Sequence, residues 1–179
     1  MELNYEKGNI AIKNKVITAL DEFVLDFTKL LEKYTKYTIV SGYVAILFGR
    51  ARGTEDIDTL IESIDKNVFT SFYRMLINKG YYFLNPENIE LKFVKDDFDR
   101  YAMDNRIKVT IDDKHIFISP IELQIPYKLY LESNKDIEDA VYLWDIFKEK
   151  IDLNLLKKFM KTRLGLFILM SMAVLHDFR

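Results

Sequence analysis

The segment from Val40 to Ile61, VSGYVAILFGRARGTEDIDTLI, places glycines, two arginines and an Asp-Ile-Asp triplet between two apolar runs. Its last six residues, DIDTLI, are rich in β-branched side chains and predict a strand. Because side chains alternate along a strand, Asp56 and Asp58 lie on one face and Ile57 faces the other way. Two carboxylates this close repel each other unless a cation or a hydrogen-bond donor neutralises them. The sequence therefore predicts a charged site on a short strand.

The residues just before this strand are suited to phosphate. Tyr37–Ser41 (YTIVS) is β-rich and predicts a short central strand, after which Gly42 begins a short apolar helix. Where a strand leads into a helix, the backbone N–H groups of Gly42 and the hydroxyl of Ser41 can hold a phosphate. Arg50 and Arg52 follow in the loop, where guanidinium groups could grip phosphate oxygens.

Acids and phosphate-binding groups in one segment predict a metal-assisted reaction. Oxygen ligands suit Mg²⁺, which takes one or two carboxylates and leaves positions for water and substrate phosphates. Asp56 and Asp58 are the candidate ligands. A phosphate cradle, an acid pair and arginines together indicate phosphoryl or nucleotidyl transfer.

Composition excludes other classes of site. None of the 179 residues is cysteine, which excludes disulfides, thiolate nucleophiles and Cys-based zinc sites. A formal net charge of -2 gives no overall basic field for nucleic acid.

The opening residues MELNYEKGNI lack the apolar core of a signal peptide, so we expect a cytoplasmic protein. The apolar run Leu164–Leu175 is too short, at about 1.5 Å per residue, for a bilayer core of about 30 Å. We expect it to form a buried helix or a homodimer contact, without membrane binding.

The rest of the chain alternates helices and strands. Apolar periodicity predicts a helix over Lys13–Tyr34 and another that begins after Asp65 and stops at Gly80. Further strands are expected at YYFL (81–84), at Ile89–Val94 and in a hairpin that turns at Asp112 and Asp113. These elements predict an α+β protein in which a small mixed sheet is flanked by helices.

The C-terminal part is expected to be helical. Ser119–Glu122 (SPIE) has a cap, a proline and a glutamate in the order of a helix start, and Pro126 is expected to kink or restart that helix. Further helices are expected in SNKDIEDAVYLWDIF and after Asp152. We therefore expect an α/β core over residues 1–119 and a helical subdomain over residues 120–179, packed on the same core.

The segment IVSGYVAILFGRARGTEDIDTLI resembles the signature of polymerase-β-type minimal nucleotidyltransferases. Its pattern G-x-A…G-R-x-R-x-T-x-D-I-D is most similar to the AbiEii-type (abortive infection) branch. The residues that match in order are Gly42, Gly49, Arg50, Arg52, Thr54, Asp56 and Asp58. Ser41 stands where the family usually has a glycine, and Val44 stands where it commonly has an alanine. The resemblance implies a sheet of the nucleotidyltransferase type.

A weaker resemblance covers ISPIELQIPYKLYLESNKDIEDAVYL, which is similar to a later segment of the same family. The matching residues are Ser119, Glu122, Lys128, Lys135, Asp136 and Asp139. In such enzymes the lysine faces the active site, which implies that Lys128 contacts the nucleotide phosphates. Glu122 is interpreted as a helix-capping residue.

The family has a third catalytic carboxylate on a strand between these two segments. It helps to hold the catalytic metal and can take the proton of the attacking hydroxyl. The resemblance implies that Glu90, in NIELKF, has this role. Asp96, Asp97 and Asp99 are close enough in sequence to remain alternatives.

The resemblance implies a Mg²⁺-dependent enzyme that moves NMP from an NTP to a hydroxyl and releases pyrophosphate. Asp56, Asp58 and Glu90 would be catalytic and would hold the metal, with two ions when the NTP is bound. Ser41, Gly42, Arg50, Arg52 and Lys128 would bind the nucleotide. The acceptor could be RNA, a protein or a small molecule, and the abortive-infection kinship implies a toxin–antitoxin partner protein.

Two alternatives stay open. The chain could be a catalytically degenerate relative that serves as a binding or interaction module, which would be favoured if Glu90 faced away from Asp56 and Asp58. It could also be a helical interaction protein whose Asp-x-Asp is incidental, which an absence of strands at 37–41 and 56–61 would support.

Overall fold

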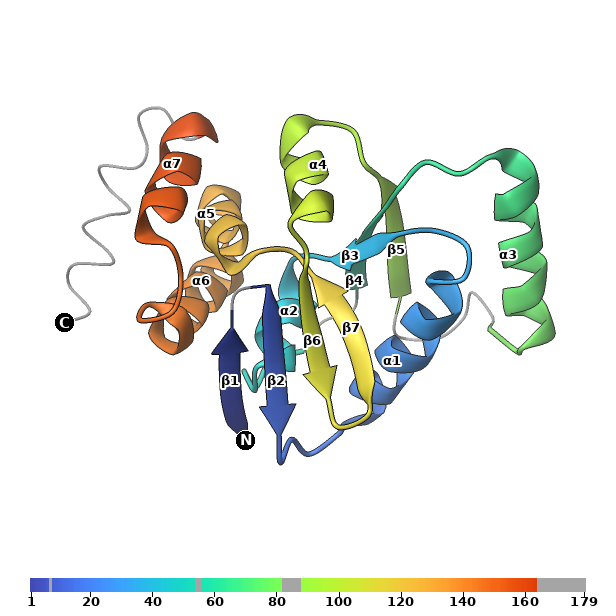
Figure 1. Cartoon of the computed structure of the whole chain (residues 1–179), viewed down its shortest axis with the longest axis horizontal. Coiled ribbons are helices and arrows are strands. Elements are labelled where there is room, and N and C mark those ends of the chain that lie inside the picture. Colours follow the sequence, from blue (N-terminus) through green and yellow to red (C-terminus); the bar gives the residue numbers. More distant parts are fainter. Residues whose placement is uncertain (7, 54–55, 82–87, 164–179) are drawn as a thin grey trace. The chain divides into compact units, whose positions relative to one another are not determined.

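The computed structural model describes residues 1–6, 8–53, 56–81 and 88–163. The chain divides into two compact units, Met1–Ser119 and Pro120–Arg179. Figure 1 labels the helices and strands of each unit. Thr54, the apolar run 164–175 and most of the strand expected at 81–84 lie outside the described residues.

The first unit is built on a mixed sheet whose described strands run in the order β1-β2-β6-β7-β3-β4-β5. Their bounds are β1 (Glu2–Glu6), β2 (Asn9–Lys13), β3 (Tyr37–Ile39), β4 (Asp56–Ile61), β5 (Asn88–Phe93), β6 (Ile107–Ile111) and β7 (Lys114–Ile118). The pairs β1–β2, β6–β7 and β3–β4 are antiparallel, whereas β2–β6, β3–β7 and β4–β5 are parallel. The expected mixed sheet of an α+β protein is confirmed.

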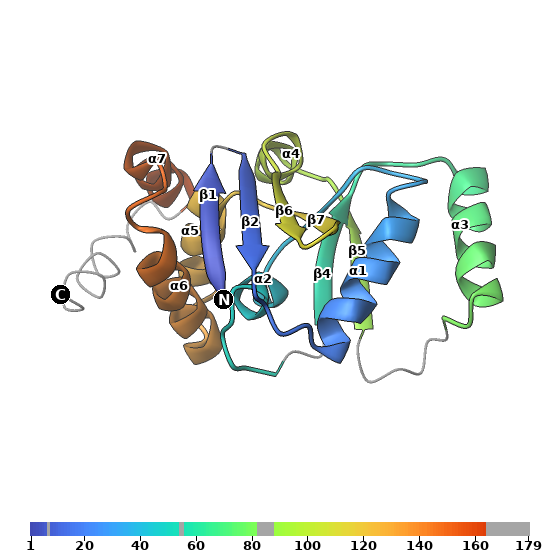
Figure 2. The same ribbon diagram turned by 60° about the horizontal axis from the view of Figure 1, so that its bottom comes forward.

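The described part of the first unit also contains four helices. Their bounds are α1 (Ala19–Leu31), α2 (Gly42–Leu47), α3 (Lys66–Asn78) and α4 (Asp97–Asp104). In Figures 1 and 2, α1 packs against β7, α2 against β4, and α4 beside β3 and β4. Asp65 is the N-cap of α3, as predicted, because its side chain accepts from the backbone N–H groups of Asn67 and Val68.

The N-terminal helix begins later than the sequence pattern predicted. Thr18 is the N-cap of α1, and Thr18 and Asp21 form a reciprocal capping box that fixes the start at Ala19. Lys13, where the helix was expected to begin, is instead the last residue of β2, which pairs with β1 through a turn at Gly8, where φ is +79°. Strands of five residues carry little periodic signal, so this hairpin was not predicted.

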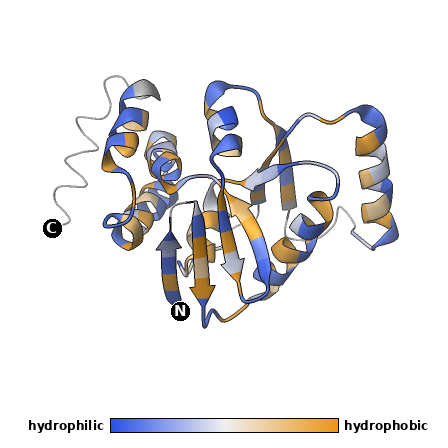
Figure 3. Ribbon diagram, in the orientation of Figure 1, coloured by the Kyte–Doolittle hydropathy of each residue, from blue (hydrophilic) through white to orange (hydrophobic). Residues whose placement is uncertain are grey.

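The core of the first unit lies on the sheet. All three residues of β3 are buried, as a central strand requires. On β4 the alternation is as predicted: Ile57, Thr59 and Ile61 are buried, whereas Asp56 is exposed. Figure 3 shows apolar residues along β2 and much of β7. The hairpin β6–β7 turns at Asp112 and Asp113, as expected.

The second unit contains α5 (Ile121–Leu131), α6 (Asn134–Phe147) and α7 (Leu153–Arg163). α5 packs against both α6 and α7. No helix in the described ranges is long and apolar enough to span a membrane.

The start of α5 corrects two details of the sequence interpretation. Pro120 occupies the N-cap position, without a side-chain cap, whereas the N–H of Ser119 donates to the carbonyl of Ile39 and so extends the sheet. Glu122 does not cap its own helix, because its Oε1 accepts from the N–H of Asp152, 3.0 Å away. Pro126 lies inside α5, which continues to Leu131.

Candidate functional site

The acids of β4 face a carboxylate on the neighbouring strand. Strands β4 and β5 are parallel and in register, with Asp56 opposite Asn88 and Asp58 opposite Glu90. Neighbouring strands lie about 4.8 Å apart, so side chains that are directly opposite share one face. The structure therefore places Glu90 beside Asp58, on the same face of the sheet as Asp56.

Lys92 joins these two acids. Its Nζ lies 2.7 Å from Oδ1 of Asp58 and 3.0 Å from Oε2 of Glu90. The side chain of Asp58 is 18% exposed, whereas those of Lys92 and Glu90 are 43% and 55% exposed. Both carboxylates thus point at one cation at the solvent boundary.

The three aspartates that could have replaced Glu90 serve another purpose. Asp96 is the N-cap of α4 and accepts from the N–H groups of Phe98 and Asp99. Asp97 lies in the first turn of α4, and Asp99 accepts from the N–H of Lys95, 3.0 Å away. None of them lies on β5, so Glu90 is the acid that β5 places beside Asp58.

The turn at Ser41 and Gly42 is connected to the acid strand. The N–H of Val40 donates to the carbonyl of Asp58 at 2.9 Å, which continues the pairing of β3 with β4 up to the turn. Ser41 has φ +68° and ψ -138°, a backbone conformation that glycine adopts and other residues rarely do. Ser41 therefore holds a glycine-like backbone conformation at this turn.

Arg52 packs against the first residue of α2. A Cβ on Gly42 would stand 3.1 Å from Nη2 of Arg52 and 3.3 Å from its Cζ. The guanidinium thus occupies the space that a side chain at position 42 would need, and its Nε donates to the carbonyl of Gly53. Arg50 lies at the other end of α2, where its N–H donates to the carbonyl of Ala45. Of the two arginines, Arg52 is the one placed at the turn.

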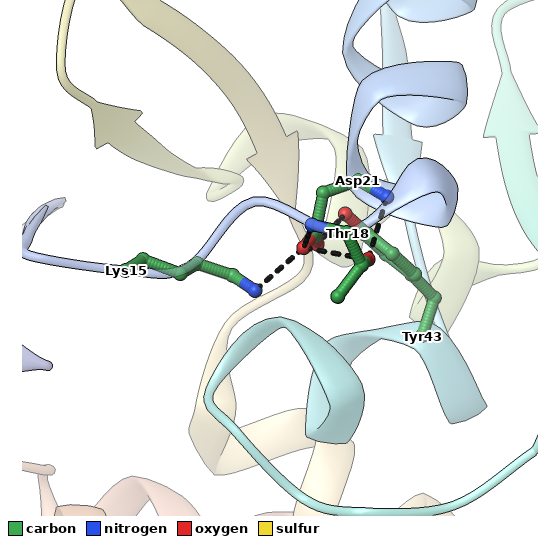
Figure 4. A network of polar contacts seen from close by, with 4 residues as sticks. All are labelled: Lys15, Thr18, Asp21 and Tyr43. Carbon is green, nitrogen blue, oxygen red and sulfur yellow. Dashed lines mark hydrogen bonds and ion pairs between the residues drawn. The ribbon is translucent and has the colours of Figure 1, made fainter.

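A buried polar network holds α2 to α1, as Figure 4 shows. Tyr43 Oη donates to Asp21 Oδ1 at 2.9 Å, and Lys15 Nζ lies 2.7 Å from Asp21 Oδ2. Thr18 donates to Oδ2 through both its hydroxyl and its N–H. Asp21 is fully buried and Lys15 is 7% exposed. This network fixes the residue that directly follows Gly42.

The environment of this network keeps Asp21 charged and Tyr43 neutral. Burial acts to raise the pKa of Asp21, but hydrogen bonds from Lys15, Thr18 and Tyr43 outweigh it and hold that pKa below the usual 3.8. Burial, and then the negative charge of Asp21, raise the pKa of Tyr43 well above 10.0. Near neutral pH Tyr43 is therefore a neutral hydroxyl that donates to a charged carboxylate.

Lys128 belongs to the second unit, on α5. Its side chain is 1% exposed, and its Nζ lies 2.5 Å from Asp136 Oδ1 and 3.0 Å from Asp139 Oδ2, both on α6. These contacts tie α5 to α6. Three of the six matching residues of the later motif, Lys128, Asp136 and Asp139, thus form one ionic cluster.

Sequence reasoning missed Lys92 and the Asp21 network. Lys92 stands two residues after Glu90 on the same strand, so alternation alone places both on one face. The spacing Thr18-x-x-Asp21 is a capping-box pattern, which could have indicated a fixed start for α1. Its contact with Tyr43 could not be found that way, because it joins residues 22 positions apart.

The donor set fits one cation held by two carboxylates. Asp58 and Glu90 already converge on a single positive charge, and carboxylate oxygens are the ligands that Mg²⁺ prefers. Within the described ranges no three Asp, Glu, His or Cys residues are grouped closely enough to hold a metal ion. A metal at this place would therefore have to share the carboxylates with Lys92 or replace it.

Comparison with known proteins agrees with this architecture. No protein-family model and no curated protein sequence matches the chain. Among solved structures, an antigenic nucleotidyltransferase-like protein from Paracoccidioides brasiliensis is similar, with a TM-score of 0.50. The fold is nucleotidyltransferase-like. The two sequences are 18% identical, and the likeness covers 70% of this chain and 75% of that one. At this identity the likeness establishes the fold alone.

Proposed function

We propose that the chain is a Mg²⁺-dependent nucleotidyltransferase that moves a nucleoside monophosphate from an NTP to a hydroxyl and releases pyrophosphate. One observation carries the proposal: Asp58 and Glu90, from adjacent strands, direct their carboxylates to a single cation at 2.7 and 3.0 Å. In a nucleotidyltransferase-like fold, oxygen ligands that converge in this way support a metal–nucleotide site.

In this proposal Asp56, Asp58 and Glu90 would hold Mg²⁺, with two ions when the NTP is bound, and the three acids would have to draw closer together to do so. The metal would neutralise the triphosphate and the departing pyrophosphate. Glu90 is exposed enough for an acceptor to reach it, and it takes the proton of the acceptor hydroxyl. The hydroxyl oxygen then bonds to the α-phosphorus as the bond from this phosphorus to the bridging oxygen breaks.

The nucleotide phosphates are proposed to lie at the turn of Ser41 and Gly42. Helix α2 is only six residues long, so its dipole contributes little there. The guanidinium of Arg52, which packs on Gly42, supplies the positive charge instead. Arg50 is proposed as a second contact. Lys128 stays a proposed phosphate contact, and it would have to leave Asp136 and Asp139 to act as one.

The acceptor and the partner are further proposals. The AbiEii-type pattern between Gly42 and Asp58 supports a role in a toxin–antitoxin pair, with a partner protein. RNA, a protein side chain or a small molecule could each supply the acceptor hydroxyl. The apolar run 164–175 supports self-association as a homodimer.

The test is calorimetric binding of each NTP with and without Mg²⁺. Native protein should bind at least one NTP in a Mg²⁺-dependent way, and Asp56→Asn/Asp58→Asn should lose that binding. The matched control is Asp112→Asn/Asp113→Asn, which removes two exposed aspartates from the hairpin turn. Binding that survives in the first variant, or no binding to any NTP, would contradict the proposal.

One observation favours a second function, that of a catalytically inactive binding or interaction module. Lys92 already neutralises Asp58 and Glu90, so the acids need no metal while the nucleotide is absent. The two functions differ in turnover. Pyrophosphate release from a bound NTP with candidate acceptors supports the enzyme, whereas NTP binding without any release supports the module.

A further inference from the structure

Lys92 is bound more tightly than an ordinary surface lysine. Its Nζ lies within hydrogen-bond distance of two carboxylates, 2.7 Å from Asp58 and 3.0 Å from Glu90. Lys36 also lies between two carboxylates, but at 3.6 Å from Glu62 and 3.5 Å from Asp104. The Lys92 contacts are therefore direct charge-assisted hydrogen bonds, and those of Lys36 are looser.

The sheet itself creates the need for this cation. Because β4 and β5 are parallel and in register at Asp58 and Glu90, two negative charges are forced side by side. Lys92 follows Glu90 by two residues, so its side chain emerges on the same face and its long stem reaches across to β4. The backbone thus places the positive charge where the two negative charges meet.

Lys92 is able to leave this position. Its side chain is 43% exposed and borders solvent, so the ammonium can swing away from both carboxylates without crossing the core.

We propose that Lys92 is a tethered counter-cation that occupies the metal position between Asp58 and Glu90 while nucleotide is absent. The inference rests on the metal site proposed above and adds its regulation. A divalent cation alone must displace Lys92 to bind, whereas an NTP brings phosphate oxygens that give the displaced ammonium a new partner. Metal binding is thereby coupled to nucleotide binding.

The experiment measures Mn²⁺ binding without nucleotide, by the electron paramagnetic resonance signal of free Mn²⁺. Lys92→Met keeps the apolar stem and removes the charge, and it should bind Mn²⁺ about five- to tenfold more tightly than native protein, since each exposed pair with Lys92 is worth up to about a fivefold change. Lys92→Arg keeps a cation and should bind like native protein. Lys36→Met is the matched control, and it should leave Mn²⁺ affinity unchanged.

The double variant Lys92→Met/Asp58→Asn tests whether the tighter Mn²⁺ binding takes place at Asp58. It should lose the extra Mn²⁺ affinity that Lys92→Met gains. Circular dichroism establishes that each variant is folded. Equal Mn²⁺ affinity in native protein and Lys92→Met, absence of Mn²⁺ binding in both, or a gain that persists in the double variant would each overturn the inference.

The failure of this inference can be told from failure of the proposed function. If native protein binds Mg²⁺ and NTP together but Lys92→Met gains no Mn²⁺ affinity, the inference fails and the proposed function stands. If Lys92→Met gains Mn²⁺ affinity but no NTP binds, the counter-cation stands and the proposed function fails.

Discussion

The guanidinium of Arg52 lies where Gly42 would carry a side chain, 3.1 Å from the position of a Cβ. The two residues come from opposite ends of the segment that connects β3 to β4. Their contact brings a positive charge to the turn that precedes α2. The glycine at position 42 leaves room for this guanidinium, and its own φ does not lie in the left-handed range.

Gly42→Ala should displace Arg52 without unfolding the protein. The neighbour is the flexible end of a side chain, so it can move by a few tenths of an ångström, and alanine favours the helix start. We expect thermal stability within about 0.5 kcal/mol of native protein. NTP affinity should fall about five- to tenfold, because a charge-assisted phosphate contact is weakened. Calorimetry and thermal melts measure both quantities.

Gly53→Ala is the control for Gly42→Ala, because nothing lies within 4 Å of a Cβ at position 53. It should leave NTP affinity unchanged. Equal NTP affinities for the two variants would show that the position of Arg52 does not matter for binding.

Ser41→Gly should stabilise the protein. Ser41 has φ +68° and ψ -138°, a conformation that costs a residue with a Cβ about 1–3 kcal/mol. Glycine removes this strain but loses about 1 kcal/mol through its greater freedom in the unfolded chain. The net gain should be about 1 kcal/mol in urea denaturation. Ser41→Ala keeps the Cβ and should gain nothing, so a glycine variant no more stable than the alanine variant would argue against strain at this turn.

Asp21→Asn should destabilise the protein strongly. The change removes the charge that Lys15 faces at 2.7 Å in a buried site, and it disturbs the hydrogen bonds of Thr18 and Tyr43. Losing one member of a buried ion pair costs about 3 kcal/mol. Asp26→Asn is the control on the same helix, because Asp26 is exposed. It should change the free energy of unfolding by less than about 0.5 kcal/mol.

Asp21 also makes stability depend on pH at the acidic end. Its pKa in the folded protein lies below the usual 3.8, so the unfolded chain takes up its proton first as the pH falls. The stability that the carboxylate contributes is complete above its unfolded pKa and is lost as pH falls through the folded pKa. Native protein should therefore lose stability more steeply below pH 3.8 than Asp21→Asn does. Parallel slopes in urea titrations would contradict this role.

Lys128→Met should destabilise the helical unit. The change removes the ammonium that lies 2.5 Å from Asp136 Oδ1 and 3.0 Å from Asp139 Oδ2. Asp139 is fully buried, so the loss of this cation is costly. The expected cost is about 3 kcal/mol. Lys157→Met, an exposed lysine on α7, should be neutral within about 0.5 kcal/mol.

NTP affinity of Lys128→Met then separates two roles, at a temperature where the variant stays folded. Unchanged affinity means that Lys128 acts only on α5 and α6. A loss of affinity supports the proposed phosphate contact.

The sequence by itself determined the strands β3 to β7, although not the hairpin of β1 and β2. Alternation in DIDTLI was enough to place Asp56 and Asp58 on one face and Ile57, Thr59 and Ile61 on the other. Local chemistry also determined the cap at Asp65 and the turn at Asp112 and Asp113. These features depend on residues within a few positions of one another, which is why a pattern can predict them.

Only the tertiary structure decided which residues meet across the sheet. The partner of Asp58 depends on the parallel register of β4 with β5, and a shift of one residue would turn Glu90 to the other face. The same register brings Lys92 to both acids. Likewise, burial of Asp21 against Tyr43 joins helices that no local pattern connects. Register and burial arise from packing of the whole core, so the single cation shared by Asp58 and Glu90 could not be read from their spacing in the chain.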